Sequence, residues 1–323
     1  MHSAIVIGAG LAGATRAEGN HARSLARHPD THLLGIFDID PNAARHAAQT
    51  HGTTAVASLD EALGLAPEIV VLAIHPEHRR DAWKQIWNCS SVRHVICEKP
   101  LALSTNEAKW ICDGFSQAGI PVTVNFQRRL NPTFLSLKDD IDSGRRGTLQ
   151  NVLIHYTRGL RTNACHWLDL MVMLFGPPQW INAEYSPISS PYEDDPNATI
   201  VLGYPTFHAE LVPLMSFHEA FYTGDVDITF KHERIYIPST TNYQAKHAKR
   251  WVANSQLLED ADVDFPFVNP EDDFYPVVDM VAGLLSGQTA DVPDKDRELW
   301  PARLIDLAEQ SCREHRRIDV TAA

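Results

Sequence analysis

The chain has 323 residues, which is long enough for two domains with separate hydrophobic cores. Its formal net charge of −13 opposes binding to a phosphate backbone, and no run of Lys or Arg offsets it, so we expect no nucleic-acid partner. No apolar stretch approaches the ~20 residues of a membrane span, and the N-terminus lacks a signal-peptide pattern, so we expect a cytoplasmic protein with no membrane partner.

The cysteines indicate neither a disulfide framework nor a zinc site. Their number is odd, they are scattered, and no two form a CxxC pair. We therefore expect reduced thiols and no metal. The five are Cys89, Cys97, Cys112, Cys165 and Cys312.

Residues 1–125 alternate short β-branched runs with helical stretches. The predicted strands are Ala4–Ile7, His32–Phe37, Ile69–Ile74, His94–Cys97 and Pro121–Asn125. The predicted helices are Leu11–Arg27, Pro41–His51, Leu59–Leu63, Glu77–Trp87 and Thr105–Ala118. This alternation predicts an α/β domain of the Rossmann type, with a parallel sheet covered by helices on both faces.

The pattern changes after Asn131-Pro132, and residues 126–294 are expected to form an α+β domain. Helices are predicted at Thr133–Ser143, Asn163–Phe175 and Pro270–Ser286, and strands at Leu149–Thr157, Trp180–Tyr185, Thr199–Tyr204, Thr206–Val212, Asp225–Lys231 and Arg234–Pro238. Residues 245–266 show no clean periodicity and receive no assignment. Since helical crossovers are absent between the later strands, we expect a large, mostly antiparallel sheet that is open on one face. Oligomerisation usually buries such a face, so we expect a homodimer or homotetramer through this sheet.

The segment Gly8-Ala9-Gly10-Leu11-Ala12-Gly13 has the GxGxxG spacing of a dinucleotide-binding loop. It directly follows a buried-type strand and opens a helix, which is the context that gives the motif its meaning. Gly8 permits the tight turn, Gly10 lets the backbone approach a pyrophosphate, and Gly13 permits close packing of helix on strand. The phosphates are then expected at the helix N-terminus, on the N–H groups of the loop. The alternative is a glycine turn in an α/β domain that binds no nucleotide.

Asp38 ends the second predicted strand, about 25 residues after Gly13. A carboxylate at that position accepts hydrogen bonds from the adenosine ribose and repels a 2′-phosphate. No Arg or Lys follows it before Arg45. We therefore predict NAD as the cofactor rather than NADP. A helix N-cap or a solvated loop acid is the alternative reading of Asp38.

Glu98-Lys99-Pro100 follows the predicted strand His94–Cys97. Ligands of parallel sheets bind beyond the carboxyl ends of the strands, so Lys99 is expected to face the cofactor site. Its ammonium group is suited to polarise a carbonyl or stabilise an alkoxide during hydride transfer. Taken alone, the tripeptide reads more readily as a solvated charge pair before a turn.

Four separated motifs together resemble the glucose-fructose oxidoreductase/inositol dehydrogenase/MocA family, abbreviated Gfo/Idh/MocA. They are the glycine loop, Glu98-Lys99-Pro100-Leu101, the stretch Asn125-Phe126-Gln127-Arg128-Arg129 with Asn131-Pro132, and Cys165-His166-Trp167-Leu168-Asp169. The resemblance covers most of the chain, and it implies that Lys295–His315 packs back on the nucleotide domain. It also implies an NAD(P)-dependent dehydrogenase or reductase of sugars, cyclitols or related polyols.

The resemblance implies a role for each matching position. Lys99 would contact the reacting hydroxyl and the nicotinamide ribose, and His166 would be the acid/base. His75-Pro76 would line the dinucleotide beside Glu98, Gln127 would lie near the nicotinamide, and Arg128 near the substrate.

The sequence departs from the family pattern just before His166. Many members carry an Asp four residues before this histidine, where this chain has Thr162. Asn163 instead shares a helical face with His166, so it is suited to hold a substrate hydroxyl or to orient the imidazole. This Asn-x-x-His form resembles the branch that acts on nucleotide-linked or surface-polysaccharide sugars, including sialic-acid-like ones.

His166 falls in the first turn of the predicted helix Asn163–Phe175, where the positive helix end disfavours the imidazolium form. Oxidation of a secondary alcohol needs an acceptor for the hydroxyl proton, and a neutral histidine supplies one. The alternative is a satisfied core histidine. Asp169 is placed either to brace His166 or to interact with the helix dipole.

Other features receive weaker interpretations. Arg158 and Arg161 are suited to contact an anionic substrate, although surface arginines fit them nearly as well. Cys165 lies beside His166, but adjacent helical residues diverge, so we expect no metal or thiol pair there. The acidic run Glu193-Asp194-Asp195 is expected to be a solvated loop.

The sequence thus predicts an NAD-dependent oxidoreductase that transfers a hydride between nicotinamide and a hydroxyl or carbonyl carbon of a small-molecule sugar substrate. Two alternatives stay open. One is a non-catalytic NAD(P) sensor on the same fold, and the other is a reductase of a non-sugar carbonyl.

Overall fold

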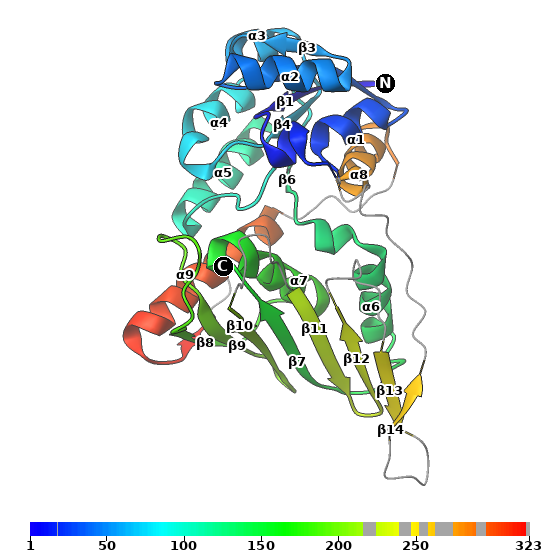
Figure 1. The fold of residues 1–323 in the computed structure, drawn as a ribbon, viewed down its shortest axis with the longest axis vertical. Helices are drawn as coiled ribbons and strands as arrows, with labels where there is room; N and C mark the ends of the chain where they lie inside the picture. The colour runs from blue at the N-terminus through cyan, green and yellow to red at the C-terminus, as the bar shows by residue number, and fades with distance from the viewer. Residues whose placement is uncertain are drawn as a thin grey trace. The chain divides into compact units, whose positions relative to one another are not determined.

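The computed structural model describes residues 1–17, 19–215, 224–238, 247–251, 258–261, 274–288 and 295–320 (Figure 1). The chain divides into two compact units. The first contains Met1–Gln127 and Asn269–Leu299, and the second contains Arg128–Val268 and Trp300–Ala323. Each unit is described by itself below.

The first unit is built on a six-stranded parallel sheet with the order β3-β2-β1-β4-β5-β6. Its strands are β1 (His2–Ile7), β2 (Thr31–Phe37), β3 (Thr54–Val56), β4 (Ile69–Leu72), β5 (His94–Cys97) and β6 (Val122–Val124). Every residue of β4 and β5 is buried, as expected of β-branched strands that are covered on both faces. The strand order reverses between β1 and β4, and the crevice at such a point is where doubly wound sheets bind their ligands. The Rossmann-type prediction is confirmed.

Capping residues set the helix boundaries of this unit. Asp40, Ser58 and Ser104 accept backbone hydrogen bonds at the starts of α2 (Pro41–His51), α3 (Leu59–Gly64) and α5 (Thr105–Ala118). Left-handed glycines end α2 and α5. The remaining helices are the 3₁₀ turn η2 (Pro76–His78), α4 (Arg80–Trp87) and α8 (Tyr275–Leu285), and α4 lies beside α5 (Figure 1).

The single helix predicted over Leu11–Arg27 is wrong. The chain instead forms a π-helical turn η1 (Leu11–Thr15) and then a separate helix α1 (His21–Arg27). The side chain of Asn20 accepts a hydrogen bond from the N–H of Arg23 and so starts a new helix. A polar residue that caps better than it propagates a helix explains the interruption.

α8 groups with the first unit, although the sequence placed its residues in the second domain. The ring of His28 on α1 contacts Asp279 at 3.2 Å, and Arg93 donates to the carbonyl of Leu285 at 3.4 Å. α8 also lies beside α1 (Figure 1). Its apolar face is therefore buried by elements far away in the sequence, which local periodicity does not identify. Pro270, where this helix was predicted to begin, lies outside the described residues.

The second unit contains a nine-stranded sheet with the order β14-β13-β12-β11-β7-β10-β9-β8-β15. Its strands are β7 (Leu149–Tyr156), β8 (Trp180–Tyr185), β9 (Ala198–Gly203), β10 (His208–Pro213), β11 (Gly224–Phe230), β12 (Glu233–Ile237), β13 (His247–Trp251), β14 (Leu258–Ala261) and β15 (Ile318–Asp319). Only the β7–β10 pair is parallel, so the prediction of a mostly antiparallel sheet is confirmed. β13 and β14 occupy the segment that received no assignment, and β15 was not predicted.

Side chains alternate along the central strands between buried positions and half-exposed ones. The buried face packs against helices, because the ring of Trp167 on α7 (Cys165–Phe175) fills the space beside Gly224 of β11. The other face mixes apolar residues such as Leu153 and Val201 with polar ones such as Asp225, whose carboxylate accepts a hydrogen bond from Tyr236.

Further helical elements follow in the described part of the chain. α6 (Pro132–Asp142) lies beside α7, and the π-helical turn η4 (Leu160–Ala164) runs into α7. α9 (Lys295–Glu314) begins in the first unit and continues in the second, where Ser311 accepts a hydrogen bond from the N–H of Ala183 on β8. Packing of the whole helix on the nucleotide domain stays a prediction. Within the described ranges no helix is long and apolar enough to cross a membrane.

Candidate active site

The glycine loop at the end of β1 has the geometry that each glycine was predicted to provide. Gly8 has φ +103°, and a Cβ on it would lie 2.5 Å from the carbonyl oxygen of Ala73 after β4. A Cβ on Gly13 would lie 1.9 Å from the carbonyl oxygen of Gly8, whereas one on Gly10 would meet nothing within 4 Å. Gly8 and Gly13 are thus required for packing, and Gly10 leaves open space in front of the loop. This open cradle at the start of a helical turn fits a dinucleotide pyrophosphate.

Asp38 ties the end of β2 to the glycine loop. One carboxylate oxygen accepts from the N–H of Ala9 at 2.7 Å, and the other accepts from the N–H of Asp40 at 2.9 Å. The carboxylate is half-buried, and each of its oxygens retains a lone pair for a further donor. A negative charge is therefore anchored beside the predicted position of the adenosine ribose.

Two large apolar side chains in this region are exposed: Leu11, in the predicted cofactor loop, and Ile39, which follows Asp38 and which sequence reasoning missed. Ile39 is 93% exposed and Leu11 is 72% exposed, although both are large hydrophobic residues. Their positions in the chain, within the glycine loop and next to Asp38, are the sequence signal that indicates a part in cofactor binding. Among the other predicted cofactor residues, His75 is exposed before η2, whereas Pro76 and Gln127 are half-buried.

Glu98 anchors the lysine-bearing loop through a buried polar network. Its carboxylate contacts the ring of His21 at 2.8 Å and accepts from the side-chain amide of Asn125 at 2.7 Å. Burial by itself raises the pKa of Glu98, but these hydrogen bonds and the charges of His21 and Lys99 hold that pKa below its ordinary value. Glu98 therefore stays ionised at neutral pH, and the turn after β5 is fixed at its first residue.

Arg79 holds the same loop from the side of β4. It is 2% exposed, and its Nε donates to the carbonyl of Ile74 at 2.7 Å, while a terminal nitrogen donates to the carbonyl of Pro100. The peptide between Lys99 and Pro100 is cis. Lys99 itself is half-exposed at the carboxyl end of β5, so its backbone is fixed while its ammonium group can reach a ligand. Sequence reasoning missed the part that Arg79 plays.

In the second unit, the loop before the helix that carries His166 packs against Asp195. Gly159 has φ +86°, and a Cβ on it would lie 2.5 Å from the carboxyl carbon of Asp195. The carboxylate of Asp195 accepts from the N–H groups of Arg161 and Thr162 at 2.7 and 2.8 Å. Asp195 therefore caps the start of η4 from a different part of the chain.

This finding corrects the interpretation of Glu193-Asp194-Asp195 as a solvated loop. Glu193 and Asp194 are exposed, but Asp195 is buried. The Asp195 carboxylate also accepts from the backbone N–H of Thr162, the position at which the family resemblance implied an aspartate side chain.

His166 lies just after the π-helical turn η4, as the second residue of α7, and it is buried. The helical segment begins at Leu160, so His166 is not in its first turn, as the predicted helix Asn163–Phe175 required. A second π-helical turn, η1, begins within the glycine loop at Leu11, and such turns occur frequently at functional sites.

Asn163 is fully buried in η4, and its side-chain amide donates to the carbonyl of Thr157 at 2.9 Å. That bond links the helix start to the end of β7. The thiol of Cys165 donates to the carbonyl of Arg161, and within the described ranges no His, Cys, Asp and Glu side chains gather as metal ligands.

A buried ion pair holds α7 on its other side. Asp169 accepts from the Nε of Arg129 at 3.1 Å and from a terminal nitrogen of the same guanidinium group. Arg128 lies with its guanidinium 4.0 Å from the centre of the Trp167 ring. Arg128 and Arg129 are consecutive residues of the 3₁₀ turn η3 (Gln127–Leu130). Arg128 contacts Trp167 and Arg129 pairs with Asp169, so this turn holds two residues of α7.

The predicted substrate arginines differ in what they contact. Arg161 forms an ion pair with Glu309 of α9 at 2.6 Å. Arg158 is half-buried with φ +71°, and its Nε is buried without a hydrogen-bond partner among the described residues. Strained conformations and unmatched buried donors are concentrated at ligand sites, so Arg158 is the stronger candidate for an anion contact. The pairing of Lys99 with His166, one from each unit, stays a prediction.

Comparisons with known proteins agree with this geometry. Residues 3–126 match the family model Gfo/Idh/MocA, described as an oxidoreductase family with an NAD-binding Rossmann fold. Glucose-6-phosphate 3-dehydrogenase of Bacillus subtilis is 26% identical over 166 residues, which are 51% of this chain and 45% of that protein. Inositol 2-dehydrogenase of Rhizobium meliloti is 29% identical over 147 residues, 45% of this chain and 43% of that protein. The matched region thus spans less than half of each relative.

Similarity of fold extends over nearly the whole chain. The crystal structure of the WlbA dehydrogenase from Bordetella pertussis, in complex with NADH and UDP-GlcNAcA, superimposes with a TM-score of 0.78 at 21% identity and covers 99% of both chains. The likeness establishes a two-part architecture, with a Rossmann domain followed by a domain built on a large sheet. The match to the Gfo/Idh/MocA family model is confined to residues 3–126, which form the Rossmann part of this chain.

Proposed function

We propose that the protein is an NAD-dependent oxidoreductase that acts on a hydroxyl or carbonyl carbon of a sugar or sugar derivative. The observation that carries the proposal is the position of Lys99, whose backbone is fixed at the carboxyl end of β5 by Glu98 and Arg79. A structural lysine on the surface needs no such buried support. The relatives named above are dehydrogenases of a sugar phosphate and of a cyclitol, which supports the substrate class.

The residues of the first unit fit NAD. The N–H groups of the glycine loop would hold the pyrophosphate, and Asp38 would accept hydrogen bonds from the adenosine ribose while it repels a 2′-phosphate. Leu11 and Ile39 would provide apolar contacts for the adenine. The nicotinamide half would be lined by His75, Pro76, Glu98, Lys99 and Gln127. When bound, NAD accepts or supplies the hydride at C4 of the nicotinamide.

The remaining chemistry belongs to two side chains. In the oxidation direction, the hydride leaves the carbon that bears the hydroxyl, and the hydroxyl proton must leave the oxygen. We assign the proton to His166 as general base, and stabilisation of the developing alkoxide to the ammonium group of Lys99. In the reverse direction His166 returns the proton to the carbonyl oxygen, so the same two residues serve both directions.

An anionic group on the substrate is the finer part of the proposal. Arg158 has a buried Nε without a partner in the described part of the chain, and Arg128 and Arg161 lie on neighbouring segments of the same unit. Asn163 would hold a substrate hydroxyl. A nucleotide-linked or sialic-acid-like sugar carries such an anion and fits this set of residues.

The decisive experiment replaces Lys99. We expect Lys99→Ala to lower turnover at least a hundredfold while the affinity for NADH changes less than threefold, since loss of one electrostatic stabiliser typically costs ~10²–10³ in rate. Lys84→Ala, which removes an exposed lysine of α4, is the matched control and should keep full turnover. Normal turnover of Lys99→Ala would contradict the assignment.

A substrate panel separates this proposal from the alternatives. NADH formation is measured over sugars, sugar phosphates and nucleotide sugars, and NADH consumption over non-sugar carbonyls. Turnover of a non-sugar carbonyl alone would indicate the reductase, and tight NADH binding without any turnover would indicate a sensor. Thr162, in place of the expected aspartate, is the feature that favours the sensor.

A further inference from the structure

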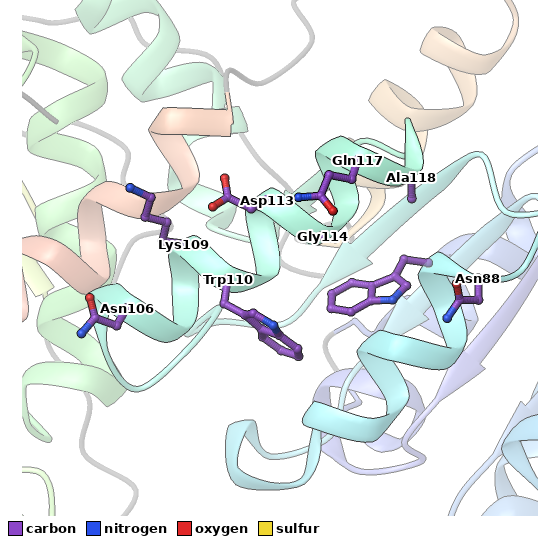
Figure 2. A pocket seen from close by; sticks show the side chains of 9 residues that line it. Asn88, Asn106, Lys109, Trp110, Asp113, Gly114, Gln117 and Ala118 are labelled. Atoms are coloured by element: carbon purple, nitrogen blue, oxygen red, sulfur yellow. The ribbon is translucent and has the colours of Figure 1, made fainter.

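A groove on the first unit lies along two packed helices, and it contains no residue of the candidate active site. It has a volume of about 690 Å³ and is formed by the end of α4 and one face of α5 (Figure 2). A volume of this size is within the range of small-molecule sites. The lining residues are Trp87, Asn88, Asn106, Lys109, Trp110, Asp113, Gly114, Gln117 and Ala118.

The α5 residues recur at helical spacing, from Asn106 to Ala118, so they form one continuous stripe. At 1.5 Å per residue this stripe is about 18 Å long. The groove is therefore elongated, and it suits a ligand that extends along the helix better than a compact one.

Two tryptophans form the apolar part of the groove, and both are held in place. The rings of Trp87 and Trp110 lie 5.0 Å apart at 69°, and the guanidinium of Arg80 lies 4.5 Å from the centre of the Trp110 ring. Both rings are half-buried, whereas Trp83, one turn before Trp87 on α4, is in the core. Figure 2 shows Trp110 pointing into the space between the two helices.

Gly114 makes the position of Trp87 possible. A Cβ at this residue would lie 2.3 Å from the Trp87 ring. Glycine is less favourable than alanine inside a helix, so Gly114 lowers the stability of α5. In return, it leaves room for the Trp87 indole to pack against this helix. A rigid, half-exposed aromatic ring loses little conformational freedom when a ligand binds it.

The polar residues of the groove carry donors and acceptors but almost no net charge. The side chains of Asn106 and Gln117 are exposed and form no hydrogen bond within the described part of the chain. Their amides both donate and accept, as hydroxyl groups do. Lys109 and Asp113 are one helical turn apart and balance each other in charge.

From this combination we infer that the groove along α5 binds a neutral carbohydrate chain, whose ring faces lie on the indoles and whose hydroxyls bond to the amides. Strong anions are disfavoured by the net charge of the protein. Lipid chains are disfavoured because most lining residues are polar. The inference stands apart from the catalytic proposal, since no residue of the groove belongs to the candidate active site.

The test uses the full chain and three neutral probes, maltotriose, cellotriose and chitotriose, with saturation-transfer NMR and calorimetry. We expect at least one probe to bind, and Trp110→Ala to weaken that binding tenfold or more. Asn106→Ala/Gln117→Ala removes only exposed side chains and should weaken it at least threefold without affecting the fold. Trp300→Ala is the matched control, because Trp300 is also half-buried with an arginine over its ring and lies in the other unit.

The variant His166→Ala separates the two proposals. Probe binding that persists in His166→Ala and is lost in Trp110→Ala supports the groove, whatever the outcome of the turnover assays. Binding lost in His166→Ala and retained in Trp110→Ala would place the sugar in the active site only and overturn the inference. So would an absence of binding by all three probes, or a change of oligomeric state in Trp110→Ala, which would identify the groove as a contact between subunits.

Discussion

The Asp38 carboxylate accepts two hydrogen bonds, one from the glycine loop and one from the turn before α2. It therefore has a structural role as well as a predicted contact with the cofactor. Salt screens the charge of a fully exposed acid, so such an acid contributes little to ligand choice. A carboxylate held by hydrogen bonds keeps its charge at a fixed place. The selectivity for NAD over NADP should therefore depend on this one side chain.

The prediction at this residue concerns cofactor choice. Asp38→Ser keeps an acceptor for the N–H of Ala9 and removes the charge, so the affinity for NADPH should rise at least tenfold relative to that for NADH. Fluorescence titration with both cofactors measures the ratio. Asp40→Ser removes an equal charge two residues away, where the side chain caps α2, and should leave the ratio unchanged. An unaltered ratio in Asp38→Ser would refute the assignment.

His94 makes the first unit sensitive to acid. It is 1% exposed in β5, where burial lowers its pKa to about 4. The folded state thus keeps a neutral imidazole, while the unfolded chain takes up a proton below its ordinary pKa of ~6.5. Stability is therefore complete above pH ~6.5 and is lost progressively as the pH falls from there toward 4.

Between pH 7.5 and pH 5 this single residue should cost about 2 kcal/mol of unfolding free energy. His94→Gln has no such proton uptake, so the difference between its stabilities at the two pH values should be smaller than that of the native chain by this amount. Urea unfolding at both pH values measures it. Equal pH dependence of the two proteins would mean that burial does not control the pKa of His94.

At the scale of elements, α7 and the π-helical turn before it are held by residues from three separate segments. Asp195 caps the start, Asn163 links it to β7, and Arg129 pairs with Asp169. The position of His166 therefore depends on contacts that are remote in sequence.

Removal of the cap should affect both stability and chemistry. Asp195→Ala should cost about 0.5–2 kcal/mol of unfolding free energy, as loss of an N-cap does. It should also lower turnover more than it changes the affinity for NADH, because His166 follows the capped turn. Asp194→Ala is the control, since Asp194 is adjacent but exposed. If the two variants behave alike, the cap does not position the catalytic helix.

The ion pair between Arg129 and Asp169 should respond asymmetrically to substitution. Asp169→Asn leaves the buried guanidinium uncompensated and should cost about 3–5 kcal/mol, whereas the double variant Arg129→Met/Asp169→Leu should recover most of that loss. Denaturant unfolding of both variants tests this. A double variant as unstable as the single one would show that the ion pair is itself strongly stabilising.

At the scale of the whole molecule, the half-exposed face of the large sheet is the feature with consequences for assembly. Leu153 and Val201 lie on it in one row across the central strands, with Glu210 between them. We predict a homodimer or homotetramer formed through this face. Leu153→Arg should shift the mass measured by light scattering toward the monomer, while Leu135→Arg on α6, at a leucine that is also exposed, should not. A native chain that is monomeric would refute the prediction.

Much of the architecture was predictable because its signals are local. The ranges of α2 and α5 agree with the prediction residue for residue, since Asp40 and Ser104 cap their starts and glycines end them. The glycine loop and Asp38 were predictable for the same reason, as their spacing along the chain is itself the motif. The break at Asn20 has a local cause, the cap on Arg23, which the periodicity did not indicate. The strands β13 and β14 were not predicted because residues 245–266 show no clean periodicity. The membership of α8 in the first unit depends on partners far away in sequence.

The sequence by itself determined that a dinucleotide-binding domain comes first and a sheet domain second, because strand–helix alternation and glycine spacing are properties of neighbouring residues. It also pointed to Lys99 and His166 as candidate catalytic residues, because a family motif is read along the chain. Only the tertiary structure decided what supports them. The carboxylate beside Thr162 comes from Asp195, and the loop of Lys99 is held by Arg79, Glu98, His21 and Asn125. Within each unit these contacts join segments that are separated in the sequence, and no local pattern predicts them.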